Sequence, residues 1–286
     1  MEWMALILIS VVLTSFQQIM QRVLLREDHS DPVAYSVVFQ ILTGLFIAVF
    51  AFLAGNLTAP QSFDNLTWNF ILLVLLYGVG NIFLFMGLKG IEASLFTILF
   101  STRGIFSVLA SSILLSEMLS AKQWIGTAII IFAIVVVNIK SLSKRDVNKG
   151  VGYSLLAGLF FGLANTNDRY ILSSFEIYPY LVIAFILPAL VVLLFQWRKL
   201  DEIKKLISNS VLLKKMLLMV LVTTFSAITF FTSLQIAPNS SQVVIINLTS
   251  VVITVLLSAF ILKEKGNLLM KVIGALLTFV GLLLVA

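Results

Sequence analysis

Long runs of apolar residues, each closed by a short polar break, follow one another along the whole chain. A run of about 20 apolar residues is the length that an α-helix needs to cross a bilayer. The runs show no alternation of period two and are about twice the length of a barrel strand, so helix is the suitable element. The pattern predicts ten transmembrane helices, over residues 3–25, 32–53, 67–88, 91–115, 121–139, 150–172, 177–196, 214–234, 238–261 and 266–285.

Turn residues and composition support this interpretation. Four of the polar breaks contain a proline, the residue that interrupts helices: Asp31-Pro32, Ala59-Pro60, Tyr178-Pro179 and Ala237-Pro238. Of the 286 residues, 60% are hydrophobic and 11% charged, against about 25% charged in a soluble domain. We therefore expect an all-α integral membrane protein, and the N-terminal run has no features of a cleaved signal peptide.

The residue types that build catalytic and metal sites are scarce. The chain has no Cys, and its one histidine, His29, lies in a charged stretch between two predicted helices. An enzyme needs a nucleophile with a base, or a metal cluster, and the sequence contains no such set inside a span. We expect neither an enzyme nor a metal or other cofactor.

Basic residues are concentrated on one side of the predicted membrane. Of the 19 Lys and Arg residues, 16 lie in the loops that follow the odd-numbered helices. The positive-inside rule then places these loops in the cytoplasm and both termini outside, in a multi-pass protein of the plasma (inner) membrane. The pI of about 9.6 is explained by anionic lipid head groups, so no nucleic-acid partner is expected. One miscounted helix would reverse half of this topology.

The second half of the chain repeats the polar pattern of the first half. With a shift of 147 residues and two one-residue slips, polar positions coincide in order: Gln18, Gln21 and Arg22 with Asn165, Asp168 and Arg169; Arg103, Ser107 and Ser111 with Ser250, Thr254 and Ser258; Glu117 with Glu264. Each half holds five predicted helices, an odd number, so the second copy enters the membrane upside down. The predicted units are 1–140 and 150–286, joined by a cytoplasmic linker, 141–149.

Residues 87–137 and 233–285 carry the same three features: small residues at the start of the fourth helix, Glu117 or Glu264 at its end, and a glycine in the next helix. In this the chain resembles a tandem EamA-type transporter of the drug/metabolite transporter superfamily. The resemblance implies a 5+5 inverted-repeat carrier of small metabolites, often an exporter of amino acids. Two features depart from it: the proline common in the middle of the family's fourth and ninth helices is absent, and the family's termini are usually cytoplasmic, whereas the charge pattern here places them outside.

Arg103 is predicted near the middle of its span, where a charge costs about 2.5–3.5 kcal/mol on insertion scales. It must face a watery cavity or a partner inside the bundle, such as Asp168 or a carbonyl. Small polar residues follow at helical spacing on this helix and on its equivalent: Ser107 and Ser111; Asn247, Ser250, Thr254 and Ser258. We expect both stripes to line one central cavity; close helix packing by small residues is the alternative.

Further polar residues are candidates for the cavity wall. Gln18 and Asn165 lie deep enough to be hydrogen-bonding groups of the cavity, as do Tyr77 with Asn81, and Thr223 with Ser226 and Thr229. Residues nearer the membrane edges are candidates for coupling or gating, with snorkelling or helix kinking as the alternative: Asp168, Arg169, Gln21, Arg22 and Pro188. Glu117 and Glu264 are interpreted as structural helix ends.

These patterns favour a metabolite carrier for substrates with a carboxylate, which Arg103 would bind. The first alternative is an antiporter of cationic drugs and protons; its usual acid in the first helix is missing from Thr14–Gln18. The second is a membrane scaffold or sensor that transports nothing. The expected partners are a small-molecule substrate and the lipid bilayer, and ten helices can enclose a site as a monomer or within a homodimer.

Overall fold

The computed structural model describes residues 2–27, 31–56, 63, 65–115, 120–138, 145–263 and 268–285, and their regular structure is entirely helical. In the first half the helices are α1 (Glu2–Glu27), α2 (Pro32–Leu53), α3 (Thr67–Gly90), α4 (Ala93–Phe100), α5 (Arg103–Leu114) and α6 (Ala121–Asn138). In the second half they are α7 (Arg145–Leu172), α8 (Ile177–Phe195), α9 (Leu200–Ser208), α10 (Ser210–Ile236), α11 (Ser240–Asn247), α12 (Ser250–Ile261) and α13 (Leu268–Val285), with a 3₁₀ turn, η1 (Trp197–Lys199).

Within the described residues, seven segments are long and apolar enough to cross a membrane, and two of them are the pairs α4–α5 and α11–α12. Shorter apolar stretches lie in α6 and α13. The 28-residue α7 is not among the seven, because its polar residues near the C-terminal end lower its mean hydropathy. The prediction of an all-helical membrane protein is confirmed.

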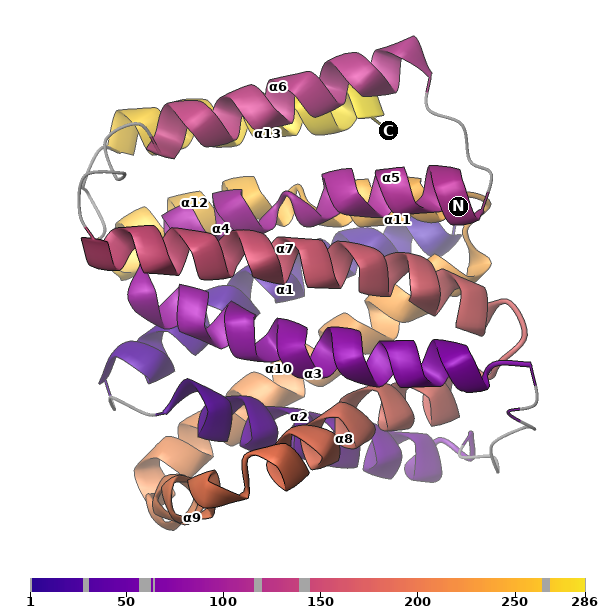
Figure 1. The fold of residues 1–286 in the computed structure, drawn as a ribbon, viewed down its shortest axis with the longest axis vertical. Coiled ribbons are helices and arrows are strands. Elements are labelled where there is room, and N and C mark those ends of the chain that lie inside the picture. The colour runs from indigo at the N-terminus through magenta and orange to yellow at the C-terminus, as the bar shows by residue number, and fades with distance from the viewer. Residues whose placement is uncertain are drawn as a thin grey trace.

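The helices lie side by side in a stack, and successive long helices run in opposite directions (Figure 1). Helices α6 and α13 pair at one end of the stack, and α2 and α8 pair near the other. The N- and C-termini lie on the same side of the stack, whereas α9 lies on the opposite side (Figure 1).

The packing between helices has the symmetry of the sequence repeat. Helix α3 packs on α7, and their equivalents α10 and α1 pack on each other. The same exchange relates the α5–α7 contact to α12–α1 and the α3–α8 contact to α10–α2. Two helices whose sequences are related by the repeat therefore occupy equivalent places in the bundle.

Each broken span contains one tightened turn between two helical halves. At the first break, Thr102 donates its hydroxyl to Leu99 O at 2.8 Å, and at the second, Thr249 donates to Ile246 O at 2.7 Å. Backbone bonds of the i→i+3 type replace some i→i+4 bonds at both places. We predicted single helices at 91–115 and 238–261; threonine hydroxyls that compete for carbonyls interrupt both, without a proline.

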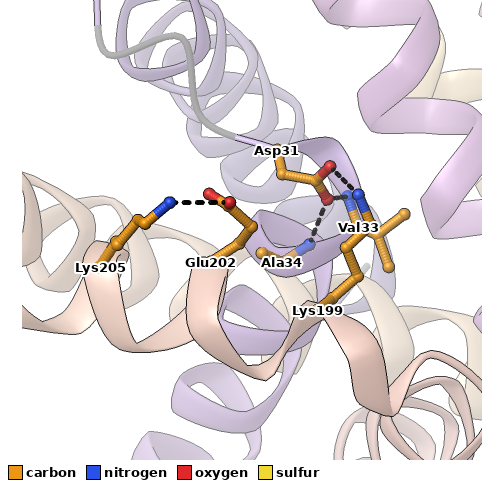
Figure 2. A network of polar contacts seen from close by, with 6 residues as sticks. All are labelled: Asp31, Val33, Ala34, Lys199, Glu202 and Lys205. Carbon is orange, nitrogen blue, oxygen red and sulfur yellow. Dashed lines mark hydrogen bonds and ion pairs between the residues drawn. The ribbon is translucent and has the colours of Figure 1, made fainter.

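The stretch after α8, which we expected to be a loop, contains the amphipathic helix α9. It directs Leu206 into the core, and the preceding turn places Lys199 against Asp31 at the start of α2, with the two charged atoms 2.6 Å apart (Figure 2). Asp31 also caps α2 by accepting from the amides of Val33 and Ala34. Apolar residues at i, i+3, i+6 and i+7 were the sequence signal for this helix.

Burial raises the pKa of the Asp31 carboxyl. The Lys199 ammonium and the two capping amides together lower it by more, so the pKa lies below its usual value of 3.8. The same ion pair raises the pKa of Lys199 above 10.5. Both groups are therefore charged at neutral pH. Glu117, Glu264, His29 and Pro60 lie outside the described residues.

Candidate functional site

A cavity of about 140 Å³ lies in the middle of the bundle between helices of both halves. Its polar lining residues come mainly from α1, α3, α7 and α10: Thr14, Gln17, Gln18, Gln21, Tyr77, Asn81, Arg103, Asn165, Thr223, Ser226 and Asn247. Its aromatic lining residues, besides Tyr77, are Phe39, Phe96, Phe100, Phe161, Phe185, Phe230 and Phe231. Arg103 is the one charged residue among those that line it.

Arg103 joins the two helix breaks. It is the first residue of α5, and its Nη2 donates to Oδ1 of Asn247, the last residue of α11, at 2.7 Å. The amide nitrogen of Asn247 donates to the Ser10 hydroxyl at 3.2 Å, which fixes the direction of its oxygen. The guanidinium lies over the ring of Phe100, 4.7 Å from the centroid. A neutral oxygen and a ring face hold this cation, but no carboxylate neutralises it among the described residues.

Gln18, Asn81 and Asn165, which the sequence also predicted, lie at the cavity wall, as does Tyr77. Gln18 accepts from the Thr97 hydroxyl at 2.7 Å, and Asn81 donates to its own helix at Tyr77 O and, at 3.3 Å, to Gln40. Asn165 is 4% exposed, and its Nδ2 has no hydrogen-bond partner. Because an unpaired buried donor costs about 1–3 kcal/mol, a ligand acceptor at this place would be favourable.

The polar residues that follow Asn165 on α7 meet different neighbours. Thr166 donates to Ser107 O on α5 at 3.2 Å. Asn167 and Asn69 of α3 exchange two hydrogen bonds, at 2.8 and 2.9 Å. Asp168 accepts a hydrogen bond from the Tyr77 hydroxyl, and forms no ion pair with Arg103 or any other described residue. Polar side chains on several faces of α7 explain why a polar run can lie inside an apolar bundle.

The expectation that Ser107, Ser250 and Thr254 line the cavity is not met. Gly158 and Gly162 bring α7 so close to the second half of the broken span that a Cβ on Gly162 would lie 2.6 Å from Arg103 O. Ser107 is enclosed in this contact, and Ser250 accepts from Ser15 of α1 through its carbonyl. Thr254 is fully buried outside the cavity wall. Small residues permit close helix packing, so the stripes lie in helix contacts instead.

Some of the candidates for coupling or gating line the cavity, and others make contacts between helices. Gln21 lines the cavity, whereas Arg22 and Arg169 donate to backbone carbonyls at the ends of α3 and α10. Pro188 lies inside α8, where its carbonyl and ring pack near Gly78 of α3. Of the remaining candidates, Thr223 and Ser226 line the cavity, but Thr229 bonds within its own helix.

The sequence interpretation missed Thr14, Gln17 and most of the aromatic wall. Thr14 bonds to Ser226 at 2.9 Å, and both residues face the cavity. Polar residues on the face of α1 that carries Gln18 and Gln21 were the available signal for Thr14. The phenylalanines had no such signal, because 23 of them are spread through a chain in which lipid also favours Phe.

Comparisons with known proteins agree with this architecture. The model of the EamA-like transporter family matches the chain twice, over residues 1–139 and 148–286. A solved structure titled "Crystal structure of protein" has the same fold, with a TM-score of 0.72 at 12% identity, over 99% of this chain and 97% of that one. None of the curated proteins matches. Because the two family matches together span nearly the whole chain, this multi-pass membrane protein belongs to the EamA-like transporter family.

Proposed function

We propose that the protein is a secondary transporter that exports small metabolites with a carboxylate, such as amino acids, by alternating access. The moving parts are two inverted five-helix units, 1–140 and 150–286, joined by the linker 141–149. They expose the cavity first to one side of the plasma (inner) membrane and then to the other. The basic loops lie in the cytoplasm and both termini outside.

The observation that carries the proposal is the uncompensated charge of Arg103 in the central cavity. Its partner Asn247 is neutral, and the nearby donor Nδ2 of Asn165 lacks an acceptor. A carboxylate supplies both a negative charge and acceptor oxygens, and charge-assisted hydrogen bonds are about twice as strong as neutral ones. The aromatic wall suits the apolar part of such a substrate. A cationic drug would meet a cation and no lining acid, which disfavours the antiporter alternative.

Two further observations support the inverted arrangement. Helix contacts keep their pattern when equivalent helices of the two halves are exchanged, which is the expected result for units related by a twofold axis. Both termini lie on one side of the bundle (Figure 1), as an even number of crossings requires. Helix α9, which follows the basic turn η1, lies on the other side (Figure 1).

Transport is tested in proteoliposomes with radiolabelled phenylalanine, benzoate, succinate and uridine, where uridine has no carboxylate. We expect at least one carboxylate to exchange, and Arg103→Gln to lower its rate at least tenfold. Arg103→Lys keeps the charge but loses the planar guanidinium. Its exchange rate should lie between those of wild type and Arg103→Gln. Arg198→Gln is the matched control, because Arg198 lies outside the cavity. Equal rates in wild type and Arg103→Gln would contradict the proposal.

Membrane topology is tested by labelling single introduced cysteines. Because the chain has no cysteine of its own, each label on the purified protein reports the introduced position. Ser173→Cys and Ser208→Cys each place a thiol at an exposed position, after α7 and at the end of α9. In intact cells, a membrane-impermeant maleimide should label Ser173→Cys and leave Ser208→Cys unlabelled until the membrane is opened. The reverse result would place the basic loops outside.

A further inference from the structure

Asp168 is a fully buried carboxyl between two phenols. Tyr77 of α3 donates its hydroxyl to Asp168 Oδ2, and Tyr180 of α8 lies close to both side chains. Two buried atoms of this group have no hydrogen-bond partner, Asp168 Oδ1 and the Tyr180 hydroxyl oxygen. Both phenol rings are themselves buried, and Tyr77 also lines the central cavity.

No cation compensates this carboxyl among the described residues. The groups that act on it directly are Tyr77 and Tyr180, and Arg103 of α5 acts on Tyr77 from the cavity side. The neighbouring Arg169 turns to the carbonyls at the end of α10. The other ionisable residues of the helices packed on α7 lie at distant helix ends: Lys89 of α3, and Lys214 and Lys215 of α10.

An ionised carboxylate in this position would lack both water and a counter-charge, and such a group costs several kcal/mol. A neutral carboxylic acid avoids that cost. Asp168 Oδ1 has no hydrogen-bond partner, so the carboxyl receives one hydrogen bond, from Tyr77 to Oδ2, whereas an ionised group needs donors at both of its oxygens. This buried environment with no counter-charge therefore favours a neutral acid, which accepts the Tyr77 hydrogen bond at Oδ2.

We infer that Asp168 is the proton-binding site of the transporter and that Tyr77 couples it to the substrate cavity, so that one proton and the anionic substrate are carried together. The inference rests on the proposed function and names its coupling ion. In the bound state the O–H bond on Oδ1 is formed with a proton taken from water. When the substrate leaves, this bond breaks and the proton returns to water on the other side.

Electrostatics determines the sign of the coupling. A negative Asp168 behind Tyr77 would repel an anion entering the cavity, whereas the neutral acid would not. Substrate binding therefore favours the protonated site and protonation favours substrate binding, as linkage requires. A monoanion carried with one proton moves no net charge.

Protonation is tested without any substrate, by infrared spectroscopy of the full-length protein in lipid at neutral pH. We expect the C=O stretching band of a buried carboxylic acid in wild type, and its loss in the isosteric Asp168→Asn. Asp31→Asn is the matched control, and it should keep the band because Asp31 lies in a surface ion pair. Tyr77→Phe, which removes the hydrogen bond to Oδ2, should shift the band to higher wavenumber. A wild-type spectrum without the band, or an equal band in Asp168→Asn, would overturn the inference.

Coupling is tested with the same four radiolabelled compounds. An outward-directed acid gradient of one pH unit should accelerate wild-type efflux of the transported carboxylate. Starting from equal concentrations on both sides, it should drive the compound out until its concentration ratio is about ten, because one proton accompanies each anion. Asp31→Asn should respond like wild type, and Asp168→Asn should give the same rate with and without the gradient. A full response in Asp168→Asn refutes the coupling role. If wild type transports none of the compounds, the proposed function fails instead, while the infrared band still decides whether Asp168 is protonated.

Discussion

Arg22 and Arg169, which the sequence repeat aligns, make the same contact at opposite sides of the bundle. Arg22 Nη1 donates to Leu88 O and Lys89 O at 2.6 and 2.9 Å. Arg169 Nη1 donates to Leu234 O and Gln235 O at 2.6 and 2.8 Å. The last carbonyls of a helix lack intrahelical partners and carry its negative dipole end, so each guanidinium caps the helix beside it.

Removal of either cap should destabilise the protein. Arg169→Gln loses a charge-assisted contact with two carbonyls, which we expect to cost about 2 kcal/mol. Arg22→Gln is the matched variant, and the losses should add in the double variant because the two sites are far apart. The measurement is the melting temperature in detergent. A melting temperature unchanged in both single variants would show that water or lipid replaces the caps.

The contact between α7 and the broken span should not tolerate a side chain at Gly162. A Cβ there would lie 2.6 Å from Arg103 O and from Phe106 Cβ, so Gly162→Ala must separate the helices. We expect a loss of about 1–3 kcal/mol and a displaced Arg103. Gly152→Ala, on the same helix with no atom within 4 Å of its Cβ, is the control and should be neutral or stabilising. Equal thermal shifts in the two variants would contradict the close contact.

A carboxylate at position 247 should affect binding and stability in different ways. Asn247→Asp places an anion on Arg103 Nη2, and its second oxygen can accept from the Ser10 hydroxyl, to which the Asn247 amide donates in the wild type. Because the guanidinium is then neutralised, carboxylate exchange in proteoliposomes should fall at least tenfold, while the melting temperature stays equal or rises. Asn247→Ala should lower both the rate of carboxylate exchange and the melting temperature. Exchange that survives in Asn247→Asp would show that the charge of Arg103 is not used for the substrate.

The ion pair between Asp31 and Lys199 should make stability depend on pH. The folded-state pKa of Asp31 is lowered, so its contribution is present above about pH 4 and is lost as the pH falls through the folded value. The raised pKa of Lys199 makes its contribution disappear only as the pH rises above 10.5. Asp31→Asn, which keeps a cap acceptor, should lose about 0.5–1 kcal/mol at pH 7. Its melting temperature should converge with that of wild type below pH 4; a constant difference would contradict the role of the pair.

The amino-acid pattern alone is enough to predict an all-helical membrane protein, because bilayer thickness and backbone hydrogen bonding leave few alternatives for apolar runs of this length. The resemblance to EamA-type transporters came from the repeated motifs instead. The amino-acid pattern did not predict the interruptions at Thr102 and Thr249, because the fourth and ninth spans read as continuous apolar helices. Arg103 was found as a cavity residue from its depth alone, since a charge at mid-span needs a polar environment.

Which polar residues face the cavity and which join helices could be read from the folded structure alone. Asn165 and Asp168 lie on the same helix one turn apart, yet the first lines the cavity and the second is enclosed between Tyr77 and Tyr180. Ser107 looked like a wall residue but lies against α7, because Gly162 removes the space between the helices. Helical periodicity gives the direction of a side chain about its own axis, whereas its neighbours depend on how closely the other helices approach.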